Sequence, residues 1–234
     1  MKQQEVTLAR QALKTPRAAA VAGIIFAVLI TTSMVLIRLA IPEELSGTNT
    51  AAWLQGNTST VTLALTLVPF AGIAFLWFMG VVRSHLGTLE DQLFSTVFFG
   101  SGLLFLAMMF ATAAIAGGIL SSYALSPDTL TKSGVILFGR AVMYTITKVY
   151  AVRMAGVFMI ALATIWIRTR VMPRVFVFLT YALALLLLVS SDFTSWLILV
   201  FPAWVFVISM FILIVSLRGE QAEAEGVIGS NESS

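Results

Sequence analysis

Residues 18–37 read AAAVAGIIFAVLITTSMVLI, an apolar run without a charged side chain. A helix needs about 20 such residues to cross the hydrocarbon core of a bilayer, which is about 30 Å thick. A secretory signal peptide is the alternative interpretation, but its apolar region covers only about 7–15 residues and ends at a small-residue cleavage site. The present run is longer and its cleavage pattern is poor. It therefore predicts a first transmembrane helix that is not removed.

The rest of the chain has the same character. Of its 234 residues, 59% are hydrophobic and 11% are charged, whereas ordinary soluble domains carry about 25% charged residues. Further apolar regions follow at about 61–82, 93–120, 134–167, 175–190 and 195–217. We therefore predict an all-α, polytopic integral membrane protein with about six transmembrane helices in a bundle.

The basic residues predict how this bundle is oriented. An even number of spans places both ends of the chain on one side, and that side carries the larger share of the lysines and arginines. These are Lys2, Arg10, Lys14, Arg17, Arg83, Arg168, Arg170, Arg174 and Arg218, against Arg38 and Lys132 on the other side. Short cytoplasmic loops are enriched in such residues. We therefore expect a multi-pass protein of the cell membrane with both termini in the cytoplasm.

The predicted topology divides the chain into three parts. Residues 1–17 form a basic N-terminal segment in the cytoplasm, and residues 18–218 form the transmembrane helical domain. Residues 219–234 are acidic and end in serine, which predicts a disordered tail. The stretch RSHLGTLEDQLFSTVFFGSGLLF, residues 83–105, resembles bacterial multi-span membrane proteins without an established activity. This resemblance covers about a tenth of the chain and implies a bacterial multi-span protein and nothing more. We expect the membrane to be the bacterial inner membrane.

The region 134–167 carries three cations, Arg140, Lys148 and Arg153. The length of this region predicts how deep each of them lies in the membrane. A helix of about 34 residues measures roughly 51 Å at 1.5 Å per residue, which exceeds one bilayer core. Counting about 20 residues back from its cytoplasmic end puts the opposite edge of the hydrocarbon near Lys148. Arg140, Tyr144, Thr147 and Lys148 then share one helical face, as in an amphipathic extension beyond the membrane. Whether this region is one long helix or breaks near Lys148 stays open.

Arg153 lies about five residues deeper than Lys148. A charge at that depth is costly against lipid, so it should face the bundle interior, a water-filled cavity or an acid. Asp192 is the nearest expected partner. An ion pair, or a side chain that reaches toward the boundary, is one interpretation, and a contact with an anion or polar ligand in an outward cavity is the other. The candidate contact residues are therefore Arg140, Tyr144, Lys148, Arg153 and Asp192.

Two helices carry small residues at the spacing that lets helix backbones approach closely. Ala19, Gly23 and Ala27 recur every four residues in the first span. In the third span, Ala113 pairs with Gly117 and Ala114 pairs with Gly118 at the same spacing. We expect these faces to pack against each other or across subunits.

The composition argues against most chemistry. The chain has no cysteine and a single histidine, His85, which excludes thiol catalysis, cysteine-ligated metals and multi-histidine metal sites within one chain. No predicted span holds paired acids or a nucleophile beside a base. Nucleic-acid patterns are absent as well. We therefore expect neither an enzyme nor a cofactor.

Two functions remain close to even on the sequence. One is an accessory or assembly subunit that contacts membrane lipids and packs against another membrane protein or a second copy of itself. The other is a small channel or permease, with an anion as the candidate substrate, in which cations of the fourth apolar region line an outward cavity. A membrane enzyme is the third and weakest reading.

Overall fold

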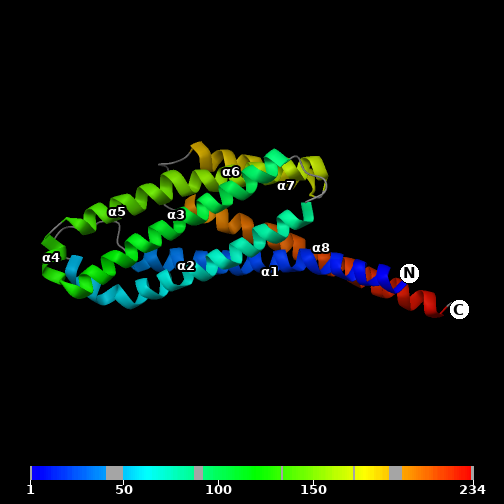
Figure 1. Cartoon of the computed structure of the whole chain (residues 1–234), viewed down its shortest axis with the longest axis horizontal. Helices are drawn as coiled ribbons and strands as arrows, with labels where there is room; N and C mark the ends of the chain where they lie inside the picture. Colours follow the sequence, from blue (N-terminus) through cyan, green and yellow to red (C-terminus); the bar gives the residue numbers. More distant parts are fainter. Residues whose placement is uncertain are drawn as a thin grey trace.

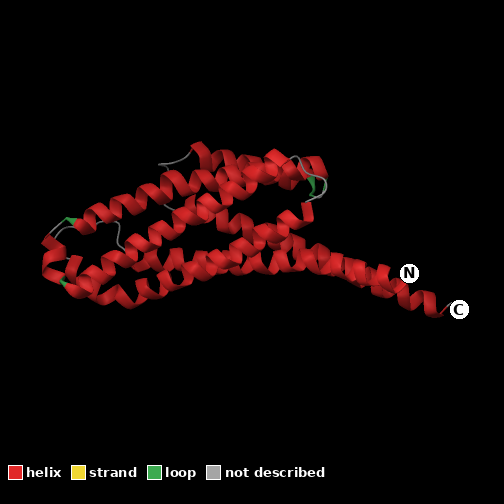
Figure 2. Cartoon of the chain, viewed as in Figure 1, coloured by secondary structure: helices red, strands yellow, loops and turns green. Residues whose placement is uncertain are grey.

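The computed structural model describes residues 2–40, 50–86, 92–132, 134–170, 172–189 and 197–232. Its side chains are described within 17–37, 56–83, 93–130 (except 128), 134–170, 172–189 and 197–218. Every element in this part of the chain is a helix (Figure 2). In order they are α1 (Lys2–Ala40), α2 (Thr50–Leu86), α3 (Gln92–Leu125), α4 (Pro127–Lys132), α5 (Val135–Thr145), η1 (Ile146–Ala151), α6 (Val152–Thr169), α7 (Arg174–Val189), η2 (Leu197–Leu199) and α8 (Val200–Glu232).

Five of these stretches are long and apolar enough to cross a membrane. They are Arg17–Ile37, Gly56–Arg83, Leu93–Leu125, Val135–Thr169 and Leu197–Arg218, with mean hydropathies from 1.8 to 2.8. The sixth apolar helix, α7, has 16 residues. At 1.5 Å per residue it measures about 24 Å, less than the roughly 30 Å of a bilayer core. The prediction of an all-α polytopic bundle is confirmed, with α7 as its shortest apolar helix.

Helices continue toward both ends of the chain. The helix α1 starts at Lys2 and continues through Pro16, so the basic segment 1–17 is continuous with the first span. At the other end α8 continues to Glu232. It includes EQAEAE at 220–225, in which glutamate, glutamine and alanine are all strong helix formers. The division of the chain at residues 17 and 218 stays a prediction.

The helices form two layers. Helix α1 packs along α2 and α8, whereas α6 packs against α7 and α3. Figure 1 shows α1, α2 and α8 together in one layer and α3, α5, α6 and α7 in the other. Both termini lie at one end of the molecule, which we call the terminal end, and α4 lies at the opposite end (Figure 1).

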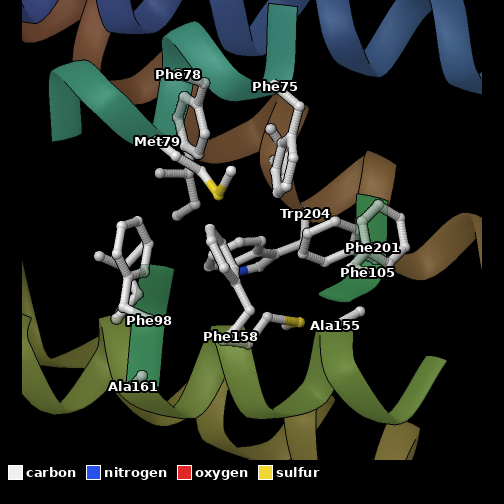
Figure 3. Close-up of a cluster of buried hydrophobic side chains, with 14 of the residues drawn as sticks. Phe75, Phe78, Met79, Phe98, Phe105, Ala155, Phe158, Ala161, Phe201 and Trp204 are labelled. Carbon is white, nitrogen blue, oxygen red and sulfur yellow. The ribbon is translucent and has the colours of Figure 1, made fainter. Parts of the chain in front are cut away.

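A cluster of aromatic side chains fills the space between the layers. Its rings come from α1, α2, α3, α6 and α8, and neighbouring centroids lie 4.5 to 6.5 Å apart. The most buried members are Phe26, Phe75, Phe78, Phe98, Phe158 and Phe201. Figure 3 shows Phe158 pointing from α6 toward Phe75 and Trp204 of the facing layer. Helices in lipid associate mainly through packing of this kind, because lipid tails are as apolar as the side chains.

Arginines mark one membrane boundary at the terminal end. Arg17 Nε donates a hydrogen bond to Ser216 Oγ at 3.3 Å and so ties α1 to α8. The guanidinium of Arg83 lies 5.1 Å from the ring centre of Phe99, and that of Arg168 lies 4.7 Å from Phe94. Both rings belong to the start of α3. Arginines on α1, α2 and α6 therefore contact the ends of α3 and α8 at this end of the molecule, as expected where helices leave the hydrocarbon.

A bilayer core that starts at this level ends about 20 residues along each helix. The count reaches Ile37 in α1, Leu63 in α2, Ala114 in α3, Lys148 in η1 and Ile198 in η2. The apolar stretches of α1 and α8 end there, whereas α2, α3 and the α5 helix continue, and α2 contacts α4. We call the continuation of α3 and the α5 helix, residues 115–147, the protruding hairpin. It comprises the end of α3, then α4, α5 and the first residues of η1.

The protruding hairpin has a small core of its own. Tyr123 and Leu130 are buried there, and Ile119, Leu120 and Ile136 pack against them. Gly139 of α5 permits the close approach of α3, because a Cβ at this position meets Ile119 Cδ1 at 2.7 Å. Figure 1 shows α4 and α5 reaching well past α7 and the start of α8. The chain therefore builds an embedded bundle and a helical projection beyond it.

Candidate functional site

The cationic residues lie on one continuous helix that changes its winding near Lys148. Helix α5 passes into the π-helical segment η1 and then into α6 without a break, so Val135–Thr169 forms a single rod. At the end of η1, Val152 N–H donates to the Thr147 carbonyl, five residues back. The open question of a break near Lys148 is thus answered by a π segment. Such segments are rare and often occur at functional sites.

Lys148 and Tyr144 form a pair on the surface of this helix. Lys148 Nζ donates a hydrogen bond to the Tyr144 hydroxyl and lies 3.9 Å from the centre of its ring. Lys148 is half-buried and Tyr144 is 56% exposed. The two are four residues apart, the spacing at which helical side chains meet. The structure thus brings together two of the residues that the sequence placed on one face.

The opposite side of the π segment is fixed against α3. The hydroxyls of Thr147 and Thr112 lie 3.1 Å apart and share a hydrogen bond. Thr147 therefore faces α3, while the next residue, Lys148, contacts Tyr144. Arg140 is half-buried on α5, about two turns beyond Lys148.

Arg153 uses part of its hydrogen-bonding capacity within its own helix. Its Nη1 donates to the Val149 carbonyl at 2.8 Å, and the side chain is half-buried. Helical side chains lean toward the N-terminus of their helix, so this guanidinium extends from its deeper position toward the level of Lys148. The expected partner Asp192 lies outside the described residues. The pairing of Arg153 with Asp192 stays a prediction.

Several polar contacts between helices escaped the sequence analysis. Trp204 Nε1 of α8 donates to Thr180 Oγ1 of α7 at 2.9 Å. Thr164 of α6 and Tyr181 of α7 share a hydrogen bond of 2.8 Å between their hydroxyls. Each joins two helices, and hydroxyls in apolar spans commonly do so. The available sequence signal was a threonine inside an apolar run, which does not reveal its partner.

The two stripes of small residues have different surroundings. Ala19, Gly23 and Ala27 are all buried. A Cβ on Gly23 would collide with Ser209 Oγ of α8 and approach Phe78 of α2, so this stripe joins α1 to both neighbours. In α3, no atom lies within 4 Å of where a Cβ would stand at Gly117 or Gly118. The two stripes do not pack against each other, and the second remains open.

Metal-binding geometry gives no further lead. Among the described residues, no group of three or more histidine, aspartate or glutamate side chains could hold a metal ion. No protein-family model, curated protein or solved structure matches this chain. The physical features of the embedded bundle and the protruding hairpin are therefore the basis for a functional proposal.

Proposed function

We propose that this chain is a non-enzymatic accessory or assembly subunit that binds a partner membrane protein through its protruding hairpin. The proposal rests on apolar exposure in the hairpin, which the count of about 20 residues from the terminal end places outside the hydrocarbon layer. Leu125, Leu137 and Phe138 are 84%, 74% and 72% exposed, and all three lie in the hairpin. Lipid covers exposed apolar side chains in the embedded bundle, but it does not reach these positions. Exposed apolar groups of this size in water favour a protein contact.

The open stripe of α3 supports the same interface. Gly117 and Gly118 lie just past the expected edge of the hydrocarbon, and Ala114 lies at that edge; Ala114 and Gly118 are exposed and Gly117 is half-buried. Small residues allow a second helix to approach closely, as Gly23 does within this chain. We propose that a partner helix leaves the membrane along this stripe and continues onto the apolar side chains of the hairpin.

A small anion channel or permease is the alternative. The observation in its favour is the placement of Lys148 and Arg153 around a π segment. Against it stands the aromatic cluster, in which Phe75, Phe158 and Phe201 fill the space between the layers. If the alternative holds, Arg153→Ala abolishes anion flux into liposomes while Arg174→Ala leaves it intact. Equal flux in both variants excludes the Arg153 site.

For the topology we propose that both termini face the cytoplasm of a bacterial cell and that the hairpin projects from the opposite face of the inner membrane. The support is the set of arginines at the terminal end, including Arg17, Arg83 and Arg168. Because the chain has no cysteine, single cysteines report the sides directly. A membrane-impermeant maleimide added outside spheroplasts should label Ser126→Cys and not Pro173→Cys. The reverse pattern contradicts this topology.

The docking proposal is tested by crosslinking in the native membrane. A photoreactive phenylalanine analogue that replaces Phe138 should yield a discrete adduct with one protein. The same analogue at Leu185, which is exposed on α7 in the embedded bundle, should react mainly with lipid. Native mass spectrometry from nanodiscs then gives the stoichiometry of the complex. A bare monomer without a protein adduct at position 138 contradicts the proposal.

A further inference from the structure

Helices α1 and α8 run antiparallel, and two contacts between them set their register. Near the membrane boundary, Arg17 Nε donates a hydrogen bond to Ser216 Oγ at 3.3 Å. Deeper in the bundle, a Cβ on Gly23 would collide with Ser209 Oγ. The two contacts are six residues apart on α1 and seven residues apart on α8. The helices therefore advance past each other in opposite directions at nearly equal steps.

Both helices continue beyond the contact of Arg17 with Ser216. Helix α1 reaches back to Lys2 and α8 runs on to Glu232, so each extends about 20 Å further at 1.5 Å per residue. Figure 1 shows the two ends reaching past the other helices at the same end of the molecule. We call residues 2–16 and 219–232 the terminal extensions. They lie outside the hydrocarbon, because Arg17 marks its boundary.

The two contacts belong to a sequence pattern that continues into both terminal extensions. Steps of three and four residues lead outward along α1 from Gly23 to Ala20, Pro16, Leu13, Ala9 and Val6, and along α8 from Ser209 to Ile212, Ser216, Gly219, Glu223 and Gly226. In this register Leu13 lies level with Gly219, and Val6 lies level with Gly226. This alternation is typical of a coiled coil, and glycine allows a facing helix to approach closely.

The charges of the terminal extensions are complementary. Residues 2–16 contain three basic residues and one glutamate, whereas residues 219–232 contain four glutamates and no lysine or arginine. Arg10 lies seven residues before Arg17, and Glu223 lies seven residues after Ser216. Seven residues are close to two helical turns, so Arg10 and Glu223 occupy facing positions in the register of the Arg17–Ser216 contact.

Neither terminal extension is favoured as a single helix in water. Helices of fewer than about 12–15 residues are marginal on their own. Pro16 removes a backbone hydrogen bond from α1, and Gly219 and Gly226 disfavour helix in α8. The continuation of both helices past the boundary is therefore accounted for by pairing, through the heptad positions and the opposite charges.

The basic extension has a second possible surface. It combines lysine and arginine with Val6, Ala9 and Leu13 at helical spacing, as in helices that lie on anionic lipid. We propose that the terminal extensions form an antiparallel coiled coil in which the acidic extension of α8 withholds the basic extension of α1 from an anionic membrane surface. This contact is autoinhibitory. It is independent of partner docking, which uses the hairpin at the opposite end of the molecule.

The first test is disulfide formation in the full chain, which has no cysteine of its own. Val6→Cys with Gly226→Cys should form a disulfide within one chain under mild oxidation in nanodiscs. The matched control combines Leu8→Cys with Gly226→Cys. Position 8 is two residues from position 6, about 200° around the helix, and this pair should stay reduced. Equal oxidation of both pairs, or disulfides only between chains, overturns the pairing.

The second test follows the basic extension on the membrane. An environment-sensitive dye on Ala12→Cys reports its surroundings in nanodiscs with and without phosphatidylglycerol. Its emission should be the same in both lipids for the otherwise unchanged chain. Replacing Glu220, Glu223 and Glu225 by glutamine retains strong helix formers but removes the opposing charge. The emission should then shift to shorter wavelength only with phosphatidylglycerol.

A matched triple variant separates this effect from net charge. Glu43→Gln, Glu44→Gln and Glu90→Gln together remove the same charge from the links between α1 and α2 and between α2 and α3, and should leave the emission unchanged. Two results overturn the withholding of the basic extension. One is an unshifted emission in the variant of α8, and the other is an equal shift in both triple variants.

Discussion

The embedded bundle and the protruding hairpin expose the same kinds of side chain to different surroundings. In the bundle, exposed residues such as Ile73 and Val207 face the lipid tails that match them. In the hairpin, Leu137 and Phe138 are more exposed, and the count of about 20 residues from the terminal end places them beyond the hydrocarbon. Exposure alone therefore does not identify an interface in a membrane protein. The position of a residue relative to the bilayer decides what its exposure means.

The largest predicted difference between the embedded bundle and the protruding hairpin is the effect of replacing one phenylalanine in each by alanine. Phe158 is fully buried in the aromatic cluster, and Phe138 is exposed on the hairpin. Phe158→Ala should lower the free energy of unfolding by about 3–5 kcal/mol, because it leaves a cavity among packed rings. Phe138→Ala should change it by less than about 0.5 kcal/mol but reduce partner binding. Unfolding titrations in mixed micelles measure the first effect and co-purification measures the second. Comparable stability losses in both variants remove the distinction between the regions.

The next contrast is between the two stripes of small residues. Gly23→Leu should destabilise the monomer by about 1–3 kcal/mol or more, because the added side chain meets Ser209 and Phe78. Gly118→Leu adds the same group where nothing lies within 4 Å. It should leave the unfolding titration unchanged and weaken the complex with the partner. A destabilised Gly118→Leu monomer indicates that the α3 stripe is already covered within the chain.

The smallest predicted effect lies where the regions meet. The hydrogen bond between Thr112 and Thr147 joins α3 to η1 just at the start of the hairpin. Thr112→Val should cost about 0.6 kcal/mol, the average for such bonds between helices in a membrane. Thr66→Val is the control, since Thr66 is exposed and bonds only the Thr62 carbonyl of its own helix. Unfolding titrations of the two variants should differ by that amount, and identical curves mean that the bond does not hold the hairpin in register.

The sequence predicted the elements better than their contacts. Charge-free runs such as 18–37 predict spanning helices because a helix satisfies the hydrogen bonds of its backbone within one segment, as the hydrocarbon requires. The spacing of Gly23 predicted a close contact, yet it could not show that α8 rather than α3 supplies the neighbour. Helical periodicity assumes 3.6 residues per turn throughout. It therefore could not predict the π segment, which only the backbone hydrogen bonding of the structure reveals.

In the candidate site, too, the sequence predicted contacts within one helix better than contacts between helices. The pairing of Tyr144 with Lys148 follows from their spacing of four residues along a helix, which is local information. The contact of Arg153 with the Val149 carbonyl also lies within one helix. A charged residue in an apolar run, however, does not show whether a backbone carbonyl, an acid or a ligand accepts its hydrogen bonds. Asp192 illustrates the limit, because an ion pair across distant segments depends on the packing of whole helices.

The π segment also accommodates one residue more than an α-helix would need at this point of a long rod. A π turn takes more residues than an α turn, so deleting one residue from η1 lets it rewind as ordinary helix with α5 and α6 close to their present relative phase. Deleting one residue from α5 itself would instead turn the part beyond it by about 100°, and Gly139 would then no longer face Ile119. Single-residue deletions should therefore be tolerated better in η1 than in the α-helical segment before it.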